Sequence, residues 1–210
     1  GGLAGYMDEG GITDSYATGD ITGTQKVGGI AGQGRDISGG YATGNVSGTN
    51  YVGGLFGSAY RVSNSYATGN VTGSGNYVGG LGGSGSGTLA NNYASGTVEG
   101  VSYVGGLFGS NDGTITDSSV KASGQVSGSG EFIGGLAGIS GSNSYSSPSI
   151  SNSNSMASVS GADGSKQIGG LVGASYGTVT NSNSTGLVTV GTNTFAVAGL
   201  MGANHGTLSN

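Results

Sequence analysis

The chain has 210 residues, with 51 Gly, 1 Pro, no Cys and a net charge of −5. The absence of Cys excludes disulfides and thiolate metal sites, and no apolar run approaches the ~20 residues of a membrane-spanning helix. The few cations form no basic run, so no nucleic-acid-binding footprint is expected; they are Lys26, Arg35, Arg61, Lys121 and Lys166. So much glycine indicates low complexity unless a period organises it.

From the N-terminus onward, the chain repeats the word Gly-Gly-Leu at intervals of 27, 25, 26, 26, 29, 35 and 29 residues. A period in this range is typical of solenoids, propellers and repeat arrays. The aliphatic residue that ends each word stands at Leu3, Ile30, Leu55, Leu81, Leu107, Leu136, Leu171 and Leu200. Three other aliphatic columns accompany it. The first comprises Val27, Val52, Val78, Val104, Ile133, Ile168 and Val197, and the second comprises Ile12, Ile37, Val62, Leu89, Ile115, Ile150, Val179 and Leu208. The third comprises Ile21, Val46, Val71, Val98, Val126, Val159 and Val188.

The apolar segments are short, β-branched and separated by Gly, Ser, Thr and Asn, which predicts strands and excludes helix. A four-stranded propeller blade would need about 40 residues, so a period of ~26 favours a solenoid. We therefore predict an all-β, parallel β-solenoid (β-helix) of about seven coils, each of ~26 residues with three short strands. It forms a single domain over 1–210, roughly 35 Å long if coils stack about 4.8 Å apart.

Both ends of the sequence lie within the repeat. It starts at Gly-Gly and ends at "GTLSN" part-way through a coil, without a capping helix. Open solenoid ends need caps, so we expect a fragment of a longer protein or ends that stack on other chains. One insertion, 139–149, doubles the interval between two aliphatic columns from 7 to 14 residues. This loop is either a binding loop or a tolerated decoration.

Two further columns, one of Gly and one mainly of Asn and Asp, predict bends in the chain. The Gly that closes each word is unchanged in every coil, which indicates either a bend with positive φ or a place without room for a Cβ atom; it stands at Gly5, Gly32, Gly57, Gly83, Gly109, Gly138, Gly173 and Gly202. A second column predicts an Asn/Asp ladder whose side chains bond to the backbone; it comprises Asp14, Gly39, Asn64, Asn91, Asp117, Asn152, Asn181 and Asn210.

An aromatic stripe is the candidate binding site. Stacked coils would align Tyr51, Tyr77, Tyr103 and Phe132, and the same position holds Lys26 and Gln167 in other coils, so it faces water. Such a stripe could bind a sugar or a protein, or it could serve only as a cross-coil ladder that stabilises the fold. A second column, which we expect to be partly exposed, comprises Tyr16, Tyr41, Tyr66 and Tyr93.

Regular hydroxyl columns on a flat solenoid are typical of ice-binding faces. One column is interrupted by Glu99, and it comprises Thr22, Ser47, Thr72, Glu99, Ser127, Ser160 and Thr189. Another is lost at Met156, and it begins with Thr18, Thr43, Thr68 and Ser95.

Catalytic groupings are weak in this sequence. The lone His205 has no partner at a recognisable spacing and is expected to be exposed. Asp14 and Asp20 share a coil and Asp36 lies in the next one, so a paired-carboxylate glycosidase or lyase site is conceivable, although turn formation by Asp14 is the simpler explanation. The run "GLGGSG" is not followed by a helix, so it is not a dinucleotide loop. No cofactor is expected, and scattered Ca²⁺ at Asp-rich bends stays open.

The words "VGGLFG" and "SNSYATGNVTG" resemble the GLUG repeat, a family named for Gly-Leu-any-Gly. The resemblance covers essentially the whole chain: GLAG at 2–5, GLFG at 54–57 and 106–109, GLGG at 80–83, GLAG at 135–138, GLVG at 170–173 and GLMG at 199–202, with GIAG at 29–32. Such repeats occur in large secreted or surface-attached bacterial proteins, among them adhesins and some immunoglobulin-A-cleaving peptidases, outside the catalytic part. The resemblance implies a surface location and a structural or adhesive role, and it carries no catalytic residue.

The sequence thus predicts a non-catalytic stalk or filament rod of an extracellular bacterial surface protein. Its expected partners are a cell-surface glycan or protein, or copies of itself end to end; neither nucleic acid nor a membrane span is expected in this segment. The alternatives are an ice-binding protein that uses a Ser/Thr face and a β-helix that binds or cleaves a polysaccharide.

Overall fold

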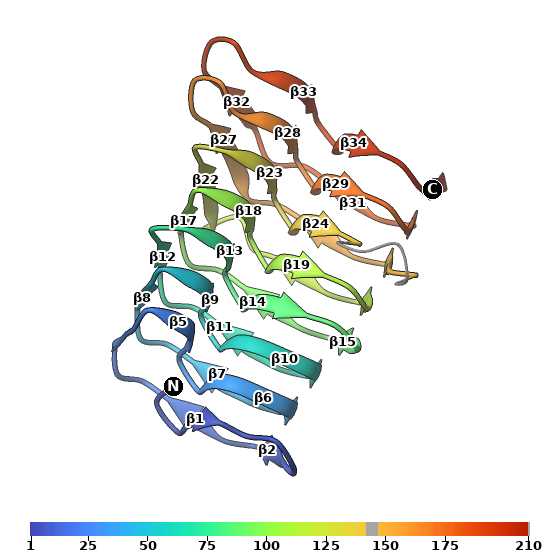
Figure 1. Ribbon diagram of the computed structural model, residues 1–210. Coiled ribbons are helices and arrows are strands. Elements are labelled where there is room, and N and C mark those ends of the chain that lie inside the picture. The colour runs from blue at the N-terminus through green and yellow to red at the C-terminus, as the bar shows by residue number, and fades with distance from the viewer. Residues whose placement is uncertain (142–146, 210) are drawn as a thin grey trace.

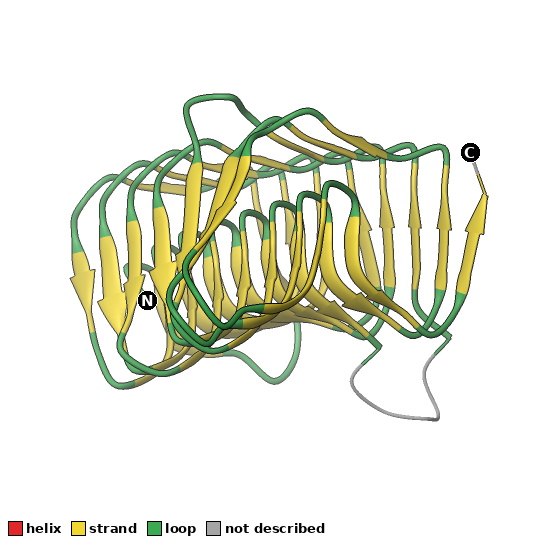
Figure 2. Cartoon of the chain, turned by 90° about the horizontal axis from the view of Figure 1, so that it is seen from above, coloured by secondary structure: helices red, strands yellow, loops and turns green. Residues whose placement is uncertain are grey.

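The structure is a computed structural model, which describes residues 1–141 and 147–209. The chain winds into a rod in which each coil lies directly on the one before it (Figure 1). Figure 2 shows the described part of the chain as strands and loops, with the strands of successive coils side by side. The prediction of an all-β parallel solenoid of about seven coils is confirmed, because every pair of neighbouring strands is parallel and three of the sheets hold seven stacked strands each.

The strands form four sheets. Sheet A contains β1 (Ala4–Tyr6), β2 (Gly11–Thr13), β6 (Ala31–Ser38), β10 (Phe56–Ser63), β14 (Gly82–Gly85), β15 (Thr88–Ala90), β19 (Phe108–Asn111), β20 (Thr114–Thr116), β24 (Ala137–Ser140), β25 (Ser149–Ser151), β29 (Val172–Ser175), β30 (Thr178–Thr180), β34 (Met201–Asn204) and β35 (Thr207–Ser209). Sheet B contains β3 (Tyr16–Ala17), β7 (Tyr41–Ala42), β11 (Tyr66–Ala67), β16 (Tyr93–Ala94), β21 (Ser119–Val120), β26 (Asn154–Ser155) and β31 (Asn183–Ser184). Sheet C contains β4 (Ile21–Thr22), β8 (Val46–Gly48), β12 (Val71–Gly73), β17 (Val98–Gly100), β22 (Gln125–Gly128), β27 (Ser158–Gly161) and β32 (Val188–Val190). Sheet D contains β5 (Gln25–Gly28), β9 (Asn50–Gly53), β13 (Asn76–Gly79), β18 (Ser102–Gly105), β23 (Glu131–Gly134), β28 (Lys166–Gly169) and β33 (Phe195–Ala198).

The prediction of three strands per coil is wrong, because each coil contributes to four sheets. The Gly-Gly-Leu word bends the chain between sheet D and sheet A, as between β9 and β10. A residue with positive φ, such as Asn64 with a φ of 52°, separates sheet A from sheet B. Sheet A also turns a corner: β6 and β10 run through it unbroken, whereas from β14 and β15 onward a short bend divides each coil's contribution into two strands. We call this corner of each coil its tip.

The core consists of the aliphatic columns that the sequence shows. In the third coil Val52, Leu55, Val62 and Val71 are all at most 1% exposed. Phe56 and Phe108, which follow the Gly-Gly-Leu word, are also completely buried. Their rings lie 6.1 Å apart on either side of the coil that carries Gly82, and a Cβ atom at Gly82 would collide with the Phe56 ring. The absence of a side chain at Gly82 therefore makes room for its two large neighbours.

The Asn/Asp column forms turns through its backbone conformation. Its described members all have a φ between 45° and 65°, a region that Gly, Asn and Asp adopt most readily; they are Asp14, Gly39, Asn64, Asn91, Asp117, Asn152 and Asn181. Asn210 lies outside the described residues. Hydrogen bonding to the backbone is carried instead by the residue that follows the column. The Ser118 hydroxyl, 2% exposed as a residue, donates to the Thr116 carbonyl at 2.8 Å and accepts from the Asn92 N–H at 3.2 Å.

From the second coil onward, the closing Gly of each word lies against the backbone of the preceding coil, whereas a Cβ atom at Gly5 in the first coil would meet nothing within 4 Å. A Cβ atom at Gly109 would be 2.6 Å from the carbonyl carbon of Tyr77 and 2.6 Å from the N atom of Val78. Gly83 and Gly138 have the same relation to Tyr51 and Tyr103. The prediction of a place without room for Cβ is confirmed, and none of these glycines has a positive φ.

The terminal coils leave their outer strand edges unpaired by any described residue. Apolar side chains are correspondingly exposed there, with Leu3 at 53%, Phe195 at 68% and Leu208 at 42%. The insertion predicted at 139–149 begins inside β24 and ends inside β25, so the connection between these strands is 141–148. Its central residues, 142–146, lie outside the described part of the chain.

Candidate functional site

The aromatic stripe lies along sheet D, where β9, β13, β18 and β23 each supply one ring. Each aromatic residue has a positive φ, which is uncommon for bulky side chains; the values are 54° at Tyr51, 63° at Tyr77, 56° at Tyr103 and 62° at Phe132. Lys26, Gln167 and Ala196 occupy the same position in other coils with a φ of 51° to 56°. The conformation therefore belongs to the solenoid and not to a specialised site.

The four rings of the stripe stack face to face. Their centroids are 4.7 Å apart between Tyr51 and Tyr77, 4.5 Å between Tyr77 and Tyr103, and 4.9 Å between Tyr103 and Phe132. The interplanar angles are 5°, 18° and 22°. Because the faces of the two inner rings are covered, a sugar could reach only their edges and hydroxyl groups. This geometry supports a ladder that stabilises the coils, and ligand binding by the stripe stays a prediction.

The stack perturbs the central phenol. Burial raises the pKa of Tyr77 above its ordinary value, and the neighbouring Tyr103, Tyr51 and Asp112 raise it further. A phenolate at this position would lose hydration and face negative charge, so the neutral form is favoured in the folded state.

The second aromatic column forms a similar ladder on sheet B. The ring centroids of Tyr16, Tyr41, Tyr66 and Tyr93 are 5.1, 5.0 and 4.8 Å apart. Tyr16 is 57% exposed and the other three are half-buried, as expected. The ammonium group of Lys121 lies 5.1 Å from the centroid of the Tyr93 ring, a cation–π arrangement that ends the ladder.

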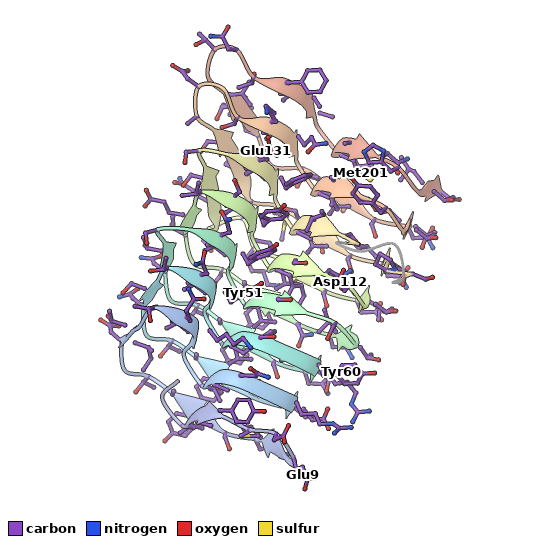
Figure 3. All side chains as sticks on the ribbon, in the orientation of Figure 1. Glu9, Tyr51, Tyr60, Asp112, Glu131 and Met201 are labelled. Atoms are coloured by element: carbon purple, nitrogen blue, oxygen red, sulfur yellow. The ribbon has the colours of Figure 1, made fainter. Side chains whose placement is uncertain are left out.

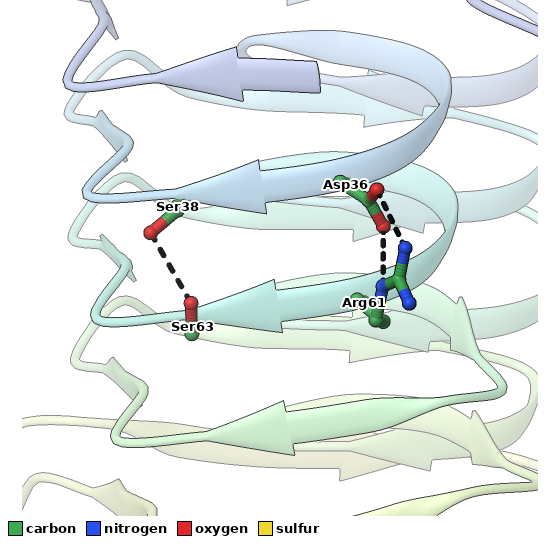
Figure 4. A network of polar contacts seen from close by, with 4 residues as sticks. All are labelled: Asp36, Ser38, Arg61 and Ser63. Atoms are coloured by element: carbon green, nitrogen blue, oxygen red, sulfur yellow. Dashed lines mark hydrogen bonds and ion pairs between the residues drawn. The ribbon is translucent and has the colours of Figure 1, made fainter. Parts of the chain in front are cut away.

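The three carboxylates considered for catalysis are engaged in structural roles or turns. Asp20 accepts a hydrogen bond from the Asn45 N–H at 2.7 Å. Asp36 pairs with Arg61 through two bonds of 2.7 and 2.8 Å (Figure 4), and the hydrogen bond from Arg61 lowers the pKa of Asp36. A glycosidase acid needs the opposite shift. No group of three His, Cys, Asp or Glu side chains that could hold a metal occurs among the described residues.

His205 is exposed, as the sequence predicts. It lies at the tip of the last coil, and its imidazole stacks on the Tyr176 ring of the coil below with centroids 4.6 Å apart. This contact was not predicted from the sequence, although both residues precede a Gly-Thr pair and therefore occupy the same position in their repeats.

The hydroxyl columns considered for ice binding lie on sheet C and beside sheet B. On sheet C the Thr22 and Ser47 hydroxyls are 3.0 Å apart, and Glu99 continues the column after Thr72. A more regular array was missed. It lies on β20, β25, β30 and β35 of sheet A, where an apolar residue separates two outward hydroxyls; the pairs are Thr114 and Thr116, Ser149 and Ser151, Thr178 and Thr180, and Thr207 and Ser209. The Thr-apolar-Thr alternation around the buried column was the signal for it.

No protein-family model and no curated protein sequence matches the chain. A solved structure has a similar fold: the crystal structure of a "putative immunoglobulin A1 protease" from Bacteroides ovatus, at 1.30 Å resolution. The superposition has a TM-score of 0.65 and 20% sequence identity, and it covers 97% of this chain and 68% of the other. At this identity the similarity establishes the solenoid fold alone. Within the described residues, no helix is long and apolar enough to cross a membrane.

Substitutions at Tyr77 test the ladder. Replacement of Tyr77 by Ala removes a ring that stacks on two neighbours and should lower the free energy of unfolding by about 1–3 kcal/mol. Replacement by Phe keeps the stack but removes the phenol with the raised pKa. Such a group stabilises the fold below its unfolded pKa, near 10.0, and that contribution is lost as pH rises through the folded value.

We therefore expect wild-type stability to fall more steeply than that of Tyr77→Phe between about pH 8 and pH 11. Urea unfolding of both proteins at these two pH values measures the difference. Identical pH dependence of the two proteins would contradict the proposed environment of Tyr77.

Proposed function

We propose that this chain is a non-catalytic structural and adhesive rod from a bacterial cell-surface protein. The observation that carries the proposal is the ladder of parallel strands that runs through all four sheets from the first coil to the last. Each interior coil is held by hydrogen bonds to the coils on both sides, so a load applied along the chain is shared between neighbours. This architecture suits a stalk that holds other parts of a protein away from a surface.

Three further observations support an extracellular location. The Gly-Leu-any-Gly words resemble the GLUG repeats of secreted and surface-attached bacterial proteins. A Bacteroides protein named as a protease has a similar fold over 97% of this chain. In addition, only five Lys and Arg residues offer few cleavage sites to trypsin-like proteases, which suits an exposed rod.

The proposed partners are a cell-surface glycan or protein, which the long faces of the rod would contact, and further coils at the ends. The terminal strand edges and the exposed Leu3, Phe195 and Leu208 side chains could be covered by copies of the chain stacked end to end. Unpaired strand edges favour the addition of further strands.

Single-molecule force spectroscopy tests the stalk. When the chain is stretched from both ends, we expect force-resisting events that each release about 90 Å of chain, the extended length of one ~26-residue coil. A chain that extends smoothly at the low forces typical of an unstructured polymer would refute the structural role.

The non-catalytic part of the proposal is tested by incubating the chain with immunoglobulin A1 and with a panel of polysaccharides. We expect no product. Product that disappears in the Asp14→Ala or Asp117→Ala variant would instead support the polysaccharide-active alternative.

A second candidate function, ice binding, is favoured by the hydroxyl array on β20, β25, β30 and β35. Outward residues two apart on one strand are about 6.6–6.8 Å apart, and neighbouring coils are about 4.8 Å apart. The array therefore repeats in two directions, and Ser149 donates to the Thr114 hydroxyl at 3.2 Å within it. No charged residue interrupts the pairs from Thr114 to Ser209.

Thermal hysteresis and ice-crystal shaping test this candidate. If the array binds ice, Thr178→Tyr should lose most of the hysteresis because the bulky ring lifts the face off a flat surface. Thr72→Tyr, on the other exposed hydroxyl column, is the matched control and should keep it. The absence of hysteresis in the wild-type chain would eliminate ice binding, whereas a clear positive would refute a role as a stalk alone.

A further inference from the structure

The tips of the second and third coils differ from the other tips of the same repeat. In the fourth, fifth and seventh coils the bend of sheet A has the form residue-Gly, at Ser86-Gly87, Asp112-Gly113 and Tyr176-Gly177. The second and third coils carry Arg35-Asp36 and Tyr60-Arg61 at this corner, within the unbroken strands β6 and β10. Because the coil closes equally well with small residues, the fold itself does not require these charged and aromatic side chains.

Stacking brings these side chains together. Figure 3 shows Tyr60 at the outer edge of the rod, on the corner of β10, with Glu9 on the tip of the first coil. An open depression between the tips is lined by Met7, Asp8, Gln33, Gly34, Arg35 and Tyr60, which come from three successive coils. Three of the chain's five cations, Lys26, Arg35 and Arg61, belong to the same coils, a grouping that their spacing in sequence hides.

Neighbouring groups orient most of the polar side chains in the depression. The Tyr6 hydroxyl donates to Asp8 at 3.2 Å, and the Lys26 ammonium donates to the Gln33 side-chain oxygen at 2.6 Å. Arg61, held by Asp36 (Figure 4), lies 5.5 Å from the Tyr60 ring centroid. Arg35 is exposed and makes no hydrogen bond or ion pair with any residue that the structure describes, so its guanidinium donors are available to a ligand.

We infer that this depression binds a neutral saccharide. Tyr60, 47% exposed, offers a ring edge and the ring face opposite Arg61, against which the C–H groups of a sugar can pack. Asp8 accepts hydrogen bonds and Arg35 donates them, and sugar hydroxyl groups can satisfy both side chains at once. Asp8 and Arg35 bring one charge of each sign to the depression, so a charged ligand is attracted by one of them and repelled by the other, whereas a neutral ligand meets neither repulsion.

Tyr176 provides a matched control on the same rod. It is a tip residue of the seventh coil and is 49% exposed, close to the value for Tyr60. One face of its ring is covered by His205, as Arg61 lies over one face of Tyr60, but the depression beside Tyr176 is lined otherwise by Ser, Pro, Gly and Thr. An exposed Tyr at a tip is therefore present there without the charged partners that a sugar would use.

The test uses the whole chain, fluorescently labelled, on an array of neutral oligosaccharides ending in glucose, galactose, mannose or N-acetylglucosamine, with sialylated and uronate-containing oligosaccharides alongside. We expect wild-type binding to one or more neutral sugars. Tyr60→Ser and Arg35→Gln should each weaken it by at least about tenfold, since each leaves hydroxyl or ring groups of the sugar without a partner. Tyr176→Ser should bind as the wild type does.

Thermal unfolding checks that the three variants are folded, and Ser is already tolerated at the tip of the fourth coil, at Ser86. Binding of none of the sugars, binding of acidic sugars only, or equal losses for Tyr60→Ser and Tyr176→Ser would each overturn the inference. None of these results would affect the stalk, because force spectroscopy tests the rod without any ligand.

Discussion

The rod depends on the close approach of successive coils at the Gly that closes each Gly-Leu-any-Gly word. At Gly109 the backbone of one coil lies where a Cβ atom would be, against Tyr77 and Val78 of the coil below. This contact fixes the distance between coils at the same place in each turn, and with it the register of all four sheets. Glycine here is a packing requirement and does not make the chain flexible.

Once the coils are in register, equivalent residues lie above one another, and each column then acts through its chemistry. Aliphatic columns form the core. The column that contains Ser118 makes hydrogen bonds to buried backbone groups of the neighbouring coil. Aromatic columns stack on the surface, so their faces are mostly used within the rod. The outward hydroxyl array of sheet A and the charged, aromatic tips of the first three coils are left open to partners. The two surfaces proposed to bind a ligand are therefore an exposed polar column and a set of tips whose residues differ from those of the other coils.

The fold could be predicted from the sequence because a position that is aliphatic in every coil is expected to face the core. The columns that contain Val52, Leu55 and Val71 are indeed buried in the interior coils. The number of strands in each coil could not be predicted. It depends on where the chain bends, and backbone conformations such as the positive φ at Asn64 and Tyr51 depend on how the coils stack. The aromatic stripe was found, but its face-to-face geometry was not, and this geometry changes what the stripe can bind. The tip site was missed because Asp8, Arg35 and Tyr60 are brought together only by stacking.

The most direct test of the central claim is the free energy of unfolding of Gly109→Ala, measured in urea by far-UV circular dichroism. The added methyl group would meet backbone atoms at 2.6 Å, so we expect a loss of about 3 kcal/mol, at the upper end of the range for overpacked sites. Gly19→Ala is the matched control, because a Cβ atom at Gly19 meets nothing within 4 Å, and its change should stay within about 0.5 kcal/mol. Equal stability of the two variants would contradict the account.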